Sequence, residues 1–158
     1  MKYEREIDYY TNGSIKIERY YLNGELHRVD EPAKIWYYED GSVKVKIYYI
    51  NNKLHRENEP AFMDYYKDGS IQTEMYYLNN IRHRLNGPAY ISHYENGNPE
   101  QEAYFIHGKL HRLDGPAEIF YHEDGSVKVK TYYIEDVEYT EFEYFVKVGM
   151  IKGEKNGI

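Results

Sequence analysis

The sequence predicts an all-β fold, in which stacked hairpins form one elongated, twisted, single-layer antiparallel sheet and no helix is expected. Three observations lead to this prediction. Sequence features recur every 28 residues, most repeats carry a Gly turn signal between two strand-like runs, and no stretch combines helical apolar spacing with helix caps. A single hairpin is marginally stable alone, so the units are expected to stack into one continuous array.

A His-Arg pair marks the 28-residue period, and a Pro-Ala follows four residues after each Arg. Glycines keep the same step and add a partial unit at the N-terminus. The array is therefore predicted over residues 1–134, with the partial unit at 1–25 and full units that begin near residues 26, 54, 82 and 110. The pairs are His27-Arg28, His55-Arg56, His83-Arg84 and His111-Arg112.

Each unit carries the pattern of a hairpin. In the stretch PAKIWYY, alternate residues point to opposite faces of a strand. The Asp-Gly of EDGS predicts a tight turn, and VKVKIYYI predicts the returning strand. We expect Ile35, Val45 and Ile47 to share the apolar face and the charged side chains to form the other.

Two regions depart from this pattern. Pro99 cannot donate a ladder hydrogen bond, which predicts a bulged or short strand there. After Tyr133 the chain loses both the His-Arg and the Pro-Ala. Residues 135–158 are therefore predicted to be a degenerate capping unit that protects the sheet edge, with a frayed tail over residues 152–158.

Composition narrows the possible functions. Acidic side chains outnumber basic ones by 27 to 20, giving a net charge of −7, which disfavours direct binding to nucleic acid or to an anionic membrane. The absence of cysteine excludes disulfides, thiolate zinc sites and a cysteine nucleophile. No apolar run is long enough for a membrane span or a signal peptide, so a cytoplasmic protein is expected.

The units resemble MORN-type repeats in their strand, Gly turn, Tyr-rich strand and NGELHR element. They are most similar to the longer variants of bacterial, phage and large-virus proteins, over Tyr3 to about Tyr133. The period is longer than the usual MORN unit, and Glu31 and Glu59 replace the Gly of the HRxxGPA link. The resemblance implies a non-catalytic scaffold for contacts with proteins and with lipids, with antitoxin-like bacterial relatives.

The His-Arg pairs could bind metal, act in catalysis or brace the fold. Equivalent residues two strands apart lie roughly 10 Å from each other, too far to share a zinc ion. An active site is usually singular, whereas these pairs recur four times. Because Arg can donate up to five hydrogen bonds to loop carbonyls, we interpret the eight residues as a structural staple, with no metal and no cofactor.

Aromatic and acidic side chains are the candidates for a partner surface. Tyrosine supplies 21 of 158 residues and gives contact area at low entropic cost. The predicted aromatic surface residues are Trp36, Tyr48, Tyr76, Tyr104, Phe120 and Tyr132. The acidic candidates could be a solvated edge or could face a basic partner, and they are Glu100, Glu102, Glu138, Glu141 and Glu143.

The sequence has no nucleophile elbow, phosphate loop, HExxH or dinucleotide fingerprint, so no enzyme is predicted. We expect a β-repeat module that binds another protein through a Tyr-rich, mixed-charge sheet face. The alternative is an acidic inhibitor, antitoxin-like or anti-defence, that blocks the basic nucleic-acid-binding site of a toxin or defence enzyme. A homodimer through a sheet edge or face is also possible.

Overall fold

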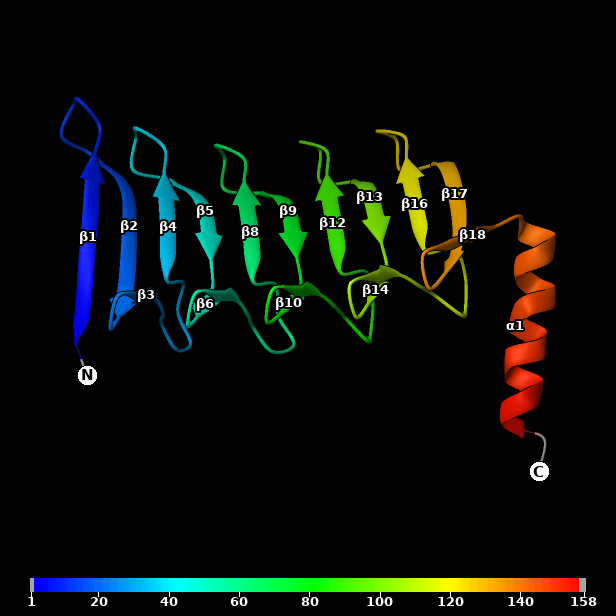
Figure 1. Ribbon diagram of the computed structural model, residues 1–158. Helices are drawn as coiled ribbons and strands as arrows, with labels where there is room; N and C mark the ends of the chain where they lie inside the picture. The colour runs from blue at the N-terminus through cyan, green and yellow to red at the C-terminus, as the bar shows by residue number, and fades with distance from the viewer. Residues whose placement is uncertain (1, 157–158) are drawn as a thin grey trace.

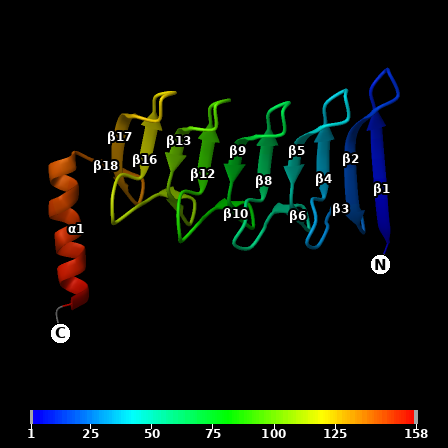
Figure 2. The ribbon, with the colours of Figure 1, turned by 180° about the vertical axis from the view of Figure 1, so that it is seen from behind.

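The computed structural model describes the backbone of residues 2–156 and the side chains of residues 2–151. It is a long row of antiparallel hairpins that ends in one helix (Figure 1). The view from behind shows the same single row in reversed order (Figure 2). The long strands are β1 (Tyr3–Tyr9), β2 (Ile15–Leu22), β4 (Lys34–Tyr37), β5 (Val43–Ile47), β8 (Phe62–Tyr65), β9 (Ile71–Met75), β12 (Tyr90–His93), β13 (Pro99–Ala103), β16 (Glu118–Tyr121) and β17 (Val127–Ile134).

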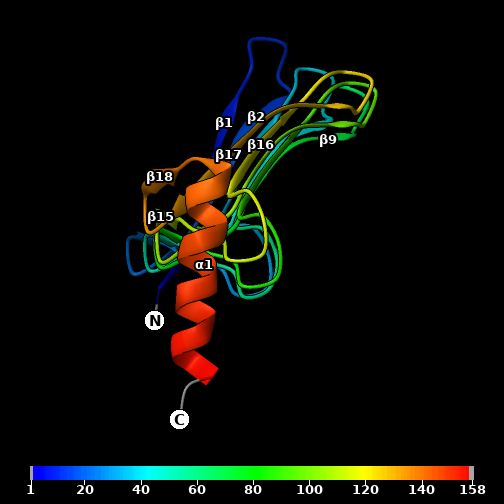
Figure 3. The same cartoon turned by 90° about the vertical axis from the view of Figure 1, so that its right-hand side faces the viewer.

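The short strands lie in a second row below the long ones (Figures 1 and 3), where the first and last pair with the ends of β2 and β17 and the others pair with one another as three small hairpins. They are β3 (Glu25–Leu26), β6 (Tyr49–Ile50), β7 (Lys53–Leu54), β10 (Tyr77–Leu78), β11 (Ile81–Arg82), β14 (Phe105–Ile106), β15 (Lys109–Leu110) and β18 (Val137–Tyr139).

The long strands pair in chain order, β1-β2-β4-β5-β8-β9-β12-β13-β16-β17, and β18 continues the sheet from β17. This open antiparallel sheet of hairpins confirms the predicted β architecture. The bulge expected at Pro99 is present opposite His93, but every main hairpin has the same register shift at the equivalent place. The bulge therefore belongs to the repeat and does not depend on the proline.

The prediction that Ile35, Val45 and Ile47 share one face is wrong. Ile35 pairs with Lys46, and Val45 pairs with Trp36. Because cross-strand partners point to the same face, Ile35 and Val45 lie on opposite faces. The bulge near each turn shifts the pairing by one residue, and such a shift moves every side chain of a strand to the other face.

The protein has small buried clusters in place of one large core. Four alanines, one at the start of each full hairpin, are completely buried where the chain passes from loop to strand. They are Ala33, Ala61, Ala89 and Ala117. Around them Tyr48 and Met63 form part of one cluster, and residues of β17 and the helix form another.

Helix α1 (Glu141–Asn156) contradicts the expectation of an all-β chain without helices. Thr140 and Glu143 form a capping box: the Thr140 amide and hydroxyl donate to the Glu143 carboxylate, and the Glu143 amide donates back to Thr140 Oγ1. Tyr144, Val148 and Ile151 follow at helical spacing and face the sheet.

The frayed tail predicted over residues 152–158 is also wrong as far as the structure describes it. The helical backbone continues through Asn156, and residues 157–158 lie outside the described part of the chain. In Figure 3 the helix lies across the end of the array, in front of the small hairpins and loops. The main strands lean away above it.

Candidate binding site

Each arginine of the His-Arg pairs lies over the tyrosine ring eight residues earlier, which belongs to the preceding unit. Arg28 stacks on Tyr20 at 4.0 Å and Arg56 on Tyr48 at 3.9 Å, measured from guanidinium carbon to ring centroid. The pairs Arg84–Tyr76 at 3.8 Å and Arg112–Tyr104 at 3.9 Å repeat the contact. This cation–π stack closes the joint between one hairpin and the next.

The same arginines also tie down the loops that follow them. Arg56, Arg84 and Arg112 each donate to the carbonyl oxygen of the proline four residues later, at 3.4, 3.0 and 3.2 Å. In the first two loops the arginine additionally pairs with the following glutamate, Arg28 with Glu31 and Arg56 with Glu59. These contacts support the structural role predicted for the arginines.

The third loop differs because Gly87 stands where the first two loops have glutamate. Gly87 has φ +128°, and a β-carbon there would lie 3.2 Å from the Arg84 guanidinium. In the first two loops the left-handed residue is the preceding one, Asp30 at φ 62° or Asn58 at φ 61°. Glycine thus lets the third loop follow a different backbone path, and position 87 brings no carboxylate to the arginine of this loop.

The histidines join each unit to the small hairpin of the next. Nδ1 of His27, His83 and His111 accepts a hydrogen bond from a backbone amide 24 residues later, at 3.3, 3.1 and 3.3 Å. The His83 ring also packs on the His107 ring, with centroids 4.7 Å apart. Burial, with the charge of His107, lowers the pKa of His83.

Tyrosine hydroxyls and turn residues add further links between units, which the sequence did not predict. In the first four main hairpins, the tyrosine directly after the first strand donates to a backbone carbonyl 27 residues later, at 2.7–2.9 Å. Asn52, Asn80 and Asp136 accept from backbone amides of the preceding small hairpin, each at 2.7 Å. The recurrence of these residue types at the 28-residue step is the signal that could have identified them.

Four hollows lie along the array beside the loops that carry the arginines, and we number them in chain order. Hollow 1 lies between β1 and the Arg28 loop, and hollows 2, 3 and 4 lie between successive arginine loops. Their volumes are about 430, 490, 280 and 560 Å³. The repeat therefore makes a series of equivalent sites, which vary only where the loops vary.

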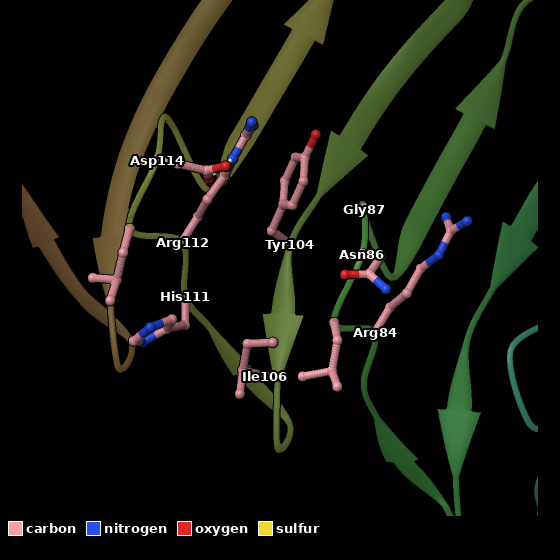
Figure 4. A pocket seen from close by; sticks show the side chains of 10 residues that line it. Arg84, Asn86, Gly87, Tyr104, Ile106, His111, Arg112 and Asp114 are labelled. Carbon is pink, nitrogen blue, oxygen red and sulfur yellow. Dashed lines mark hydrogen bonds and ion pairs between the residues drawn. The ribbon is translucent and has the colours of Figure 1, made fainter.

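Hollow 4 is the largest and is shown in Figure 4. Tyr104 and Ile106 lie between the two loops that form its walls, and His111 closes one corner. Leu85, at the tip of one wall, is 75 % exposed. The hollow thus combines an exposed aliphatic side chain, an aromatic ring and the arginines of both walls.

The residue after each arginine differs in polarity and exposure from one loop to the next. It is Val29, Glu57, Leu85 or Leu113 in the four loops. Val29 is 63 % exposed, and only Leu113 of the apolar three is covered, because helix α1 packs against it. Sequence reasoning missed these residues, although they vary between fixed neighbours at a constant position in the repeat.

The tyrosines predicted to form an exposed surface are not exposed. Tyr48, Tyr76 and Tyr132 are buried and Tyr104 is half-buried, because an arginine or, for Tyr132, the ring of Tyr144 covers them. The loop after each small hairpin carries the arginine that covers the ring of Tyr48, Tyr76 or Tyr104.

The other two aromatic candidates lie on the opposite face of the sheet from Ile35. Trp36 is 36 % exposed, and Phe120 is half-buried in the same cross-strand position three hairpins later. The Lys34 ammonium lies over the Trp36 ring, 5.1 Å from its centroid. The structure does not bring these two residues together with the hollows.

The acidic candidates bond mostly to their own chain. Glu100 accepts from Ser92, Glu102 from Tyr121 and Glu138 from Tyr133. Glu143 caps helix α1, as described above. Glu141 accepts from the Tyr132 hydroxyl at 2.5 Å; this hydrogen bond, with burial, raises the pKa of Tyr132 to about 12.

Among the described residues, no group of three or more histidines or carboxylates is placed to hold a metal ion. Over the same residues, no helix is long and apolar enough to cross a membrane. Nδ1 of three of the four repeated histidines bonds to a backbone amide, whereas Nδ1 of His55 is buried with no hydrogen-bond partner among the described residues.

A comparison with protein-family models matches four stretches of the chain to the MORN repeat variant: residues 5–23, 34–51, 89–107 and 117–135. The chain carries four MORN repeats. Each match spans one main hairpin and the start of the small hairpin after it. Residues 62–78 build the same hairpin in β8, β9 and β10 although the family model does not match them. A comparison with curated proteins gives no match.

Proposed function

We propose that this MORN-repeat protein is a non-catalytic module that binds a partner protein in the hollows along its array. The observation that carries the proposal is hollow 4, where Leu85 stands exposed between two arginine loops. An exposed apolar side chain rimmed by polar groups is typical of protein–protein interfaces, and arginine is enriched there. The MORN repeats supply the rigid scaffold on which such a site can be built.

The repeated polar side chains support a role without catalysis. The arginines stack on tyrosines, and three of the four histidines accept backbone hydrogen bonds. A general base needs a nitrogen or carboxylate within hydrogen-bond reach of a substrate. In this protein Nδ1 of those three histidines already bonds to the backbone, whereas Nδ1 of His55 has no hydrogen-bond partner among the described residues.

The alternative function, an acidic inhibitor of a basic site, requires carboxylates that are available to a partner. All five acidic candidates accept hydrogen bonds from their own chain, although all but Glu102 are exposed and keep further acceptor sites. Three of the four arginines beside the hollows pair with carboxylates of their own loops, so Arg84 is the one that fits a partner bringing a carboxylate. The observations therefore favour the binding module, and none of them specifically favours the inhibitor.

A photo-cross-linking experiment tests the proposed function. Benzoylphenylalanine would replace Leu85 in the full chain, and Ile71, which is exposed on the main sheet away from the hollows, would be replaced in a control. After illumination in the host cell, we expect an adduct with a defined protein from position 85 and none from position 71. Absence of an adduct from position 85 would contradict the proposal.

A further inference from the structure

We propose that hollow 4 binds an acidic amphipathic helix of a partner protein, whose apolar stripe covers Leu85 and Ile106 as that of helix α1 covers Leu113 and Ile134. The inference rests on the proposed function, because it names the kind of partner for the same site. It depends on the equivalence of these aliphatic side chains and not on an identical pose, because α1 begins where the array has an arginine loop, and the Arg112 loop fills that place beside hollow 4.

The surface under α1 is the next member of the series of hollows. Leu113 and Ile134 stand 28 residues after Leu85 and Ile106, the aliphatic residues of hollow 4. Helix α1 packs against both, and Ile134 is buried, whereas Ile106 is half-buried and Leu85 is exposed. A helix is therefore known to cover this combination of side chains.

The contact is made by one stripe of the helix. Tyr144, Val148 and Ile151 project from successive turns toward the array, and Tyr144 is the largest fully buried side chain among the described residues. The Tyr144 hydroxyl donates to the Arg112 carbonyl at 3.1 Å and accepts from the Gly115 amide at 3.0 Å. These two loop groups correspond to the Arg84 carbonyl and the Gly87 amide of hollow 4.

One difference limits what the partner helix must bring. The ring of Tyr104 in hollow 4 already lies under Arg112, whereas the corresponding ring of Tyr132 lies under Tyr144. A partner helix in hollow 4 therefore does not need an aromatic side chain for that ring. It needs aliphatic side chains one turn apart, in the position of Val148 and the residue three after it, to cover the exposed leucine.

Charge adds a second requirement. Arg28 and Arg56 pair with glutamates of their own loops, but the third loop has Gly87 there. Within residues 2–151, Arg84 makes no ion pair, and its guanidinium borders the space that a side chain at position 87 would take. A carboxylate of the partner can supply the missing contact, since arginine binds carboxylates strongly.

A helix fits this site better than an extended segment. Extended peptides bind by adding a strand to an open sheet edge, where backbone groups are unpaired. The edge strands of this sheet are β1 and β17–β18, and none of the residues that line hollow 4 belongs to them. Side chains and loops form the site, as in grooves that accept an amphipathic helix.

The test uses a peptide with the sequence of residues 140–151, which carries two glutamates and the Val148 stripe. A covalent bridge between positions 142 and 146, which are exposed on the outer side of α1, keeps the peptide helical. Its binding to the full-length protein is measured by fluorescence anisotropy. We expect saturable binding that weakens by about tenfold or more with Leu85→Asp in the protein or Val148→Asp in the peptide.

The matched control is Val127→Asp, an exposed valine at the start of β17 and away from the hollows, which should leave peptide binding unchanged. Thermal melting of both protein variants checks that they are folded. No saturable binding, or binding that Leu85→Asp does not weaken, overturns the inference. If a partner still cross-links to position 85 in that case, the proposed function stands and the partner is not a helix.

Discussion

The repeat array and the C-terminal end cover equivalent tyrosine rings in two different ways. In the array an arginine stacks on the ring and then holds the loop that leads to the next hairpin. At the end, Thr140 stands in place of the arginine and begins helix α1, whose Tyr144 packs on Tyr132 with ring centroids 4.7 Å apart. Where an arginine covers the ring, another hairpin follows; where Tyr144 covers it, the array ends.

This difference explains why the binding site is expected in the array. Helix α1 buries the aliphatic residues at the end, so that surface is already occupied. In hollow 4 the equivalent residues remain open. Three substitutions sharpen the comparison. In decreasing order of expected effect, they change the buried tyrosine of helix α1, the residue that caps the N-terminus of this helix and one histidine of the array.

The largest effect is expected for Tyr144→Ala. The ring is 1 % exposed and contacts both Tyr132 and the Arg112 loop, so its loss should lower the free energy of unfolding by about 3–5 kcal/mol. Urea denaturation measures the change. Phe142→Ala is the control, since Phe142 is 79 % exposed on the same helix and should change stability by about 0.5 kcal/mol or less. Equal losses in the two variants would show that α1 does not close the array.

A smaller effect is expected for Thr140→Ala. It removes the side chain that accepts from the Glu143 amide and donates to its carboxylate, and losing such a cap costs about 1 kcal/mol. The far-ultraviolet circular dichroism signal of the helix should also melt earlier. Thr140→Ser keeps the hydroxyl and should restore most of the stability; failure to do so would assign the effect to something other than the cap.

The smallest effect is a dependence of stability on pH from His83. Its pKa lies below the ordinary histidine value of about 6.5, so between the two pKa values the unfolded chain binds more protons than the folded one. This contribution to stability is complete above about pH 6.5 and is lost as the pH falls through the folded pKa. His83→Gln should make the midpoint of urea unfolding change less between pH 7.5 and 5 than it does in the unchanged protein. If the midpoint of the variant changed with pH as much as that of the unchanged protein, this assignment would be contradicted.

Much of the fold was predictable from sequence, because the period, the Gly turns and the alternation all indicate stacked hairpins. The assignment of faces failed because a bulge next to each turn shifts the register by one residue, and no single residue type signals it. The helix was not predicted although Thr140-Glu-Phe-Glu143 is a capping box, because the preceding repeats favoured further β structure after Tyr133.

The candidate site was predictable only in part. The structural role of the His-Arg pairs was predicted from their recurrence and stays a prediction. The exposure of the tyrosines depended on where the loop crosses, which spacing alone does not determine. Tyr48 and its equivalents were therefore expected in solvent and are covered by arginine. Leu85 was overlooked because one exposed leucine has no sequence signature until the surrounding hollow is known.

The central claim is that recurring residues hold the fold and that the variable loop tips form the binding site. Urea unfolding of Arg56→Ala beside Leu85→Asp tests it most directly. The account predicts a loss of about 2 kcal/mol for Arg56→Ala, which gives up a cation–π stack, an ion pair and a hydrogen bond to a carbonyl. It predicts a change within about 0.5 kcal/mol for the exposed Leu85. A larger loss for Leu85→Asp than for Arg56→Ala would contradict the account.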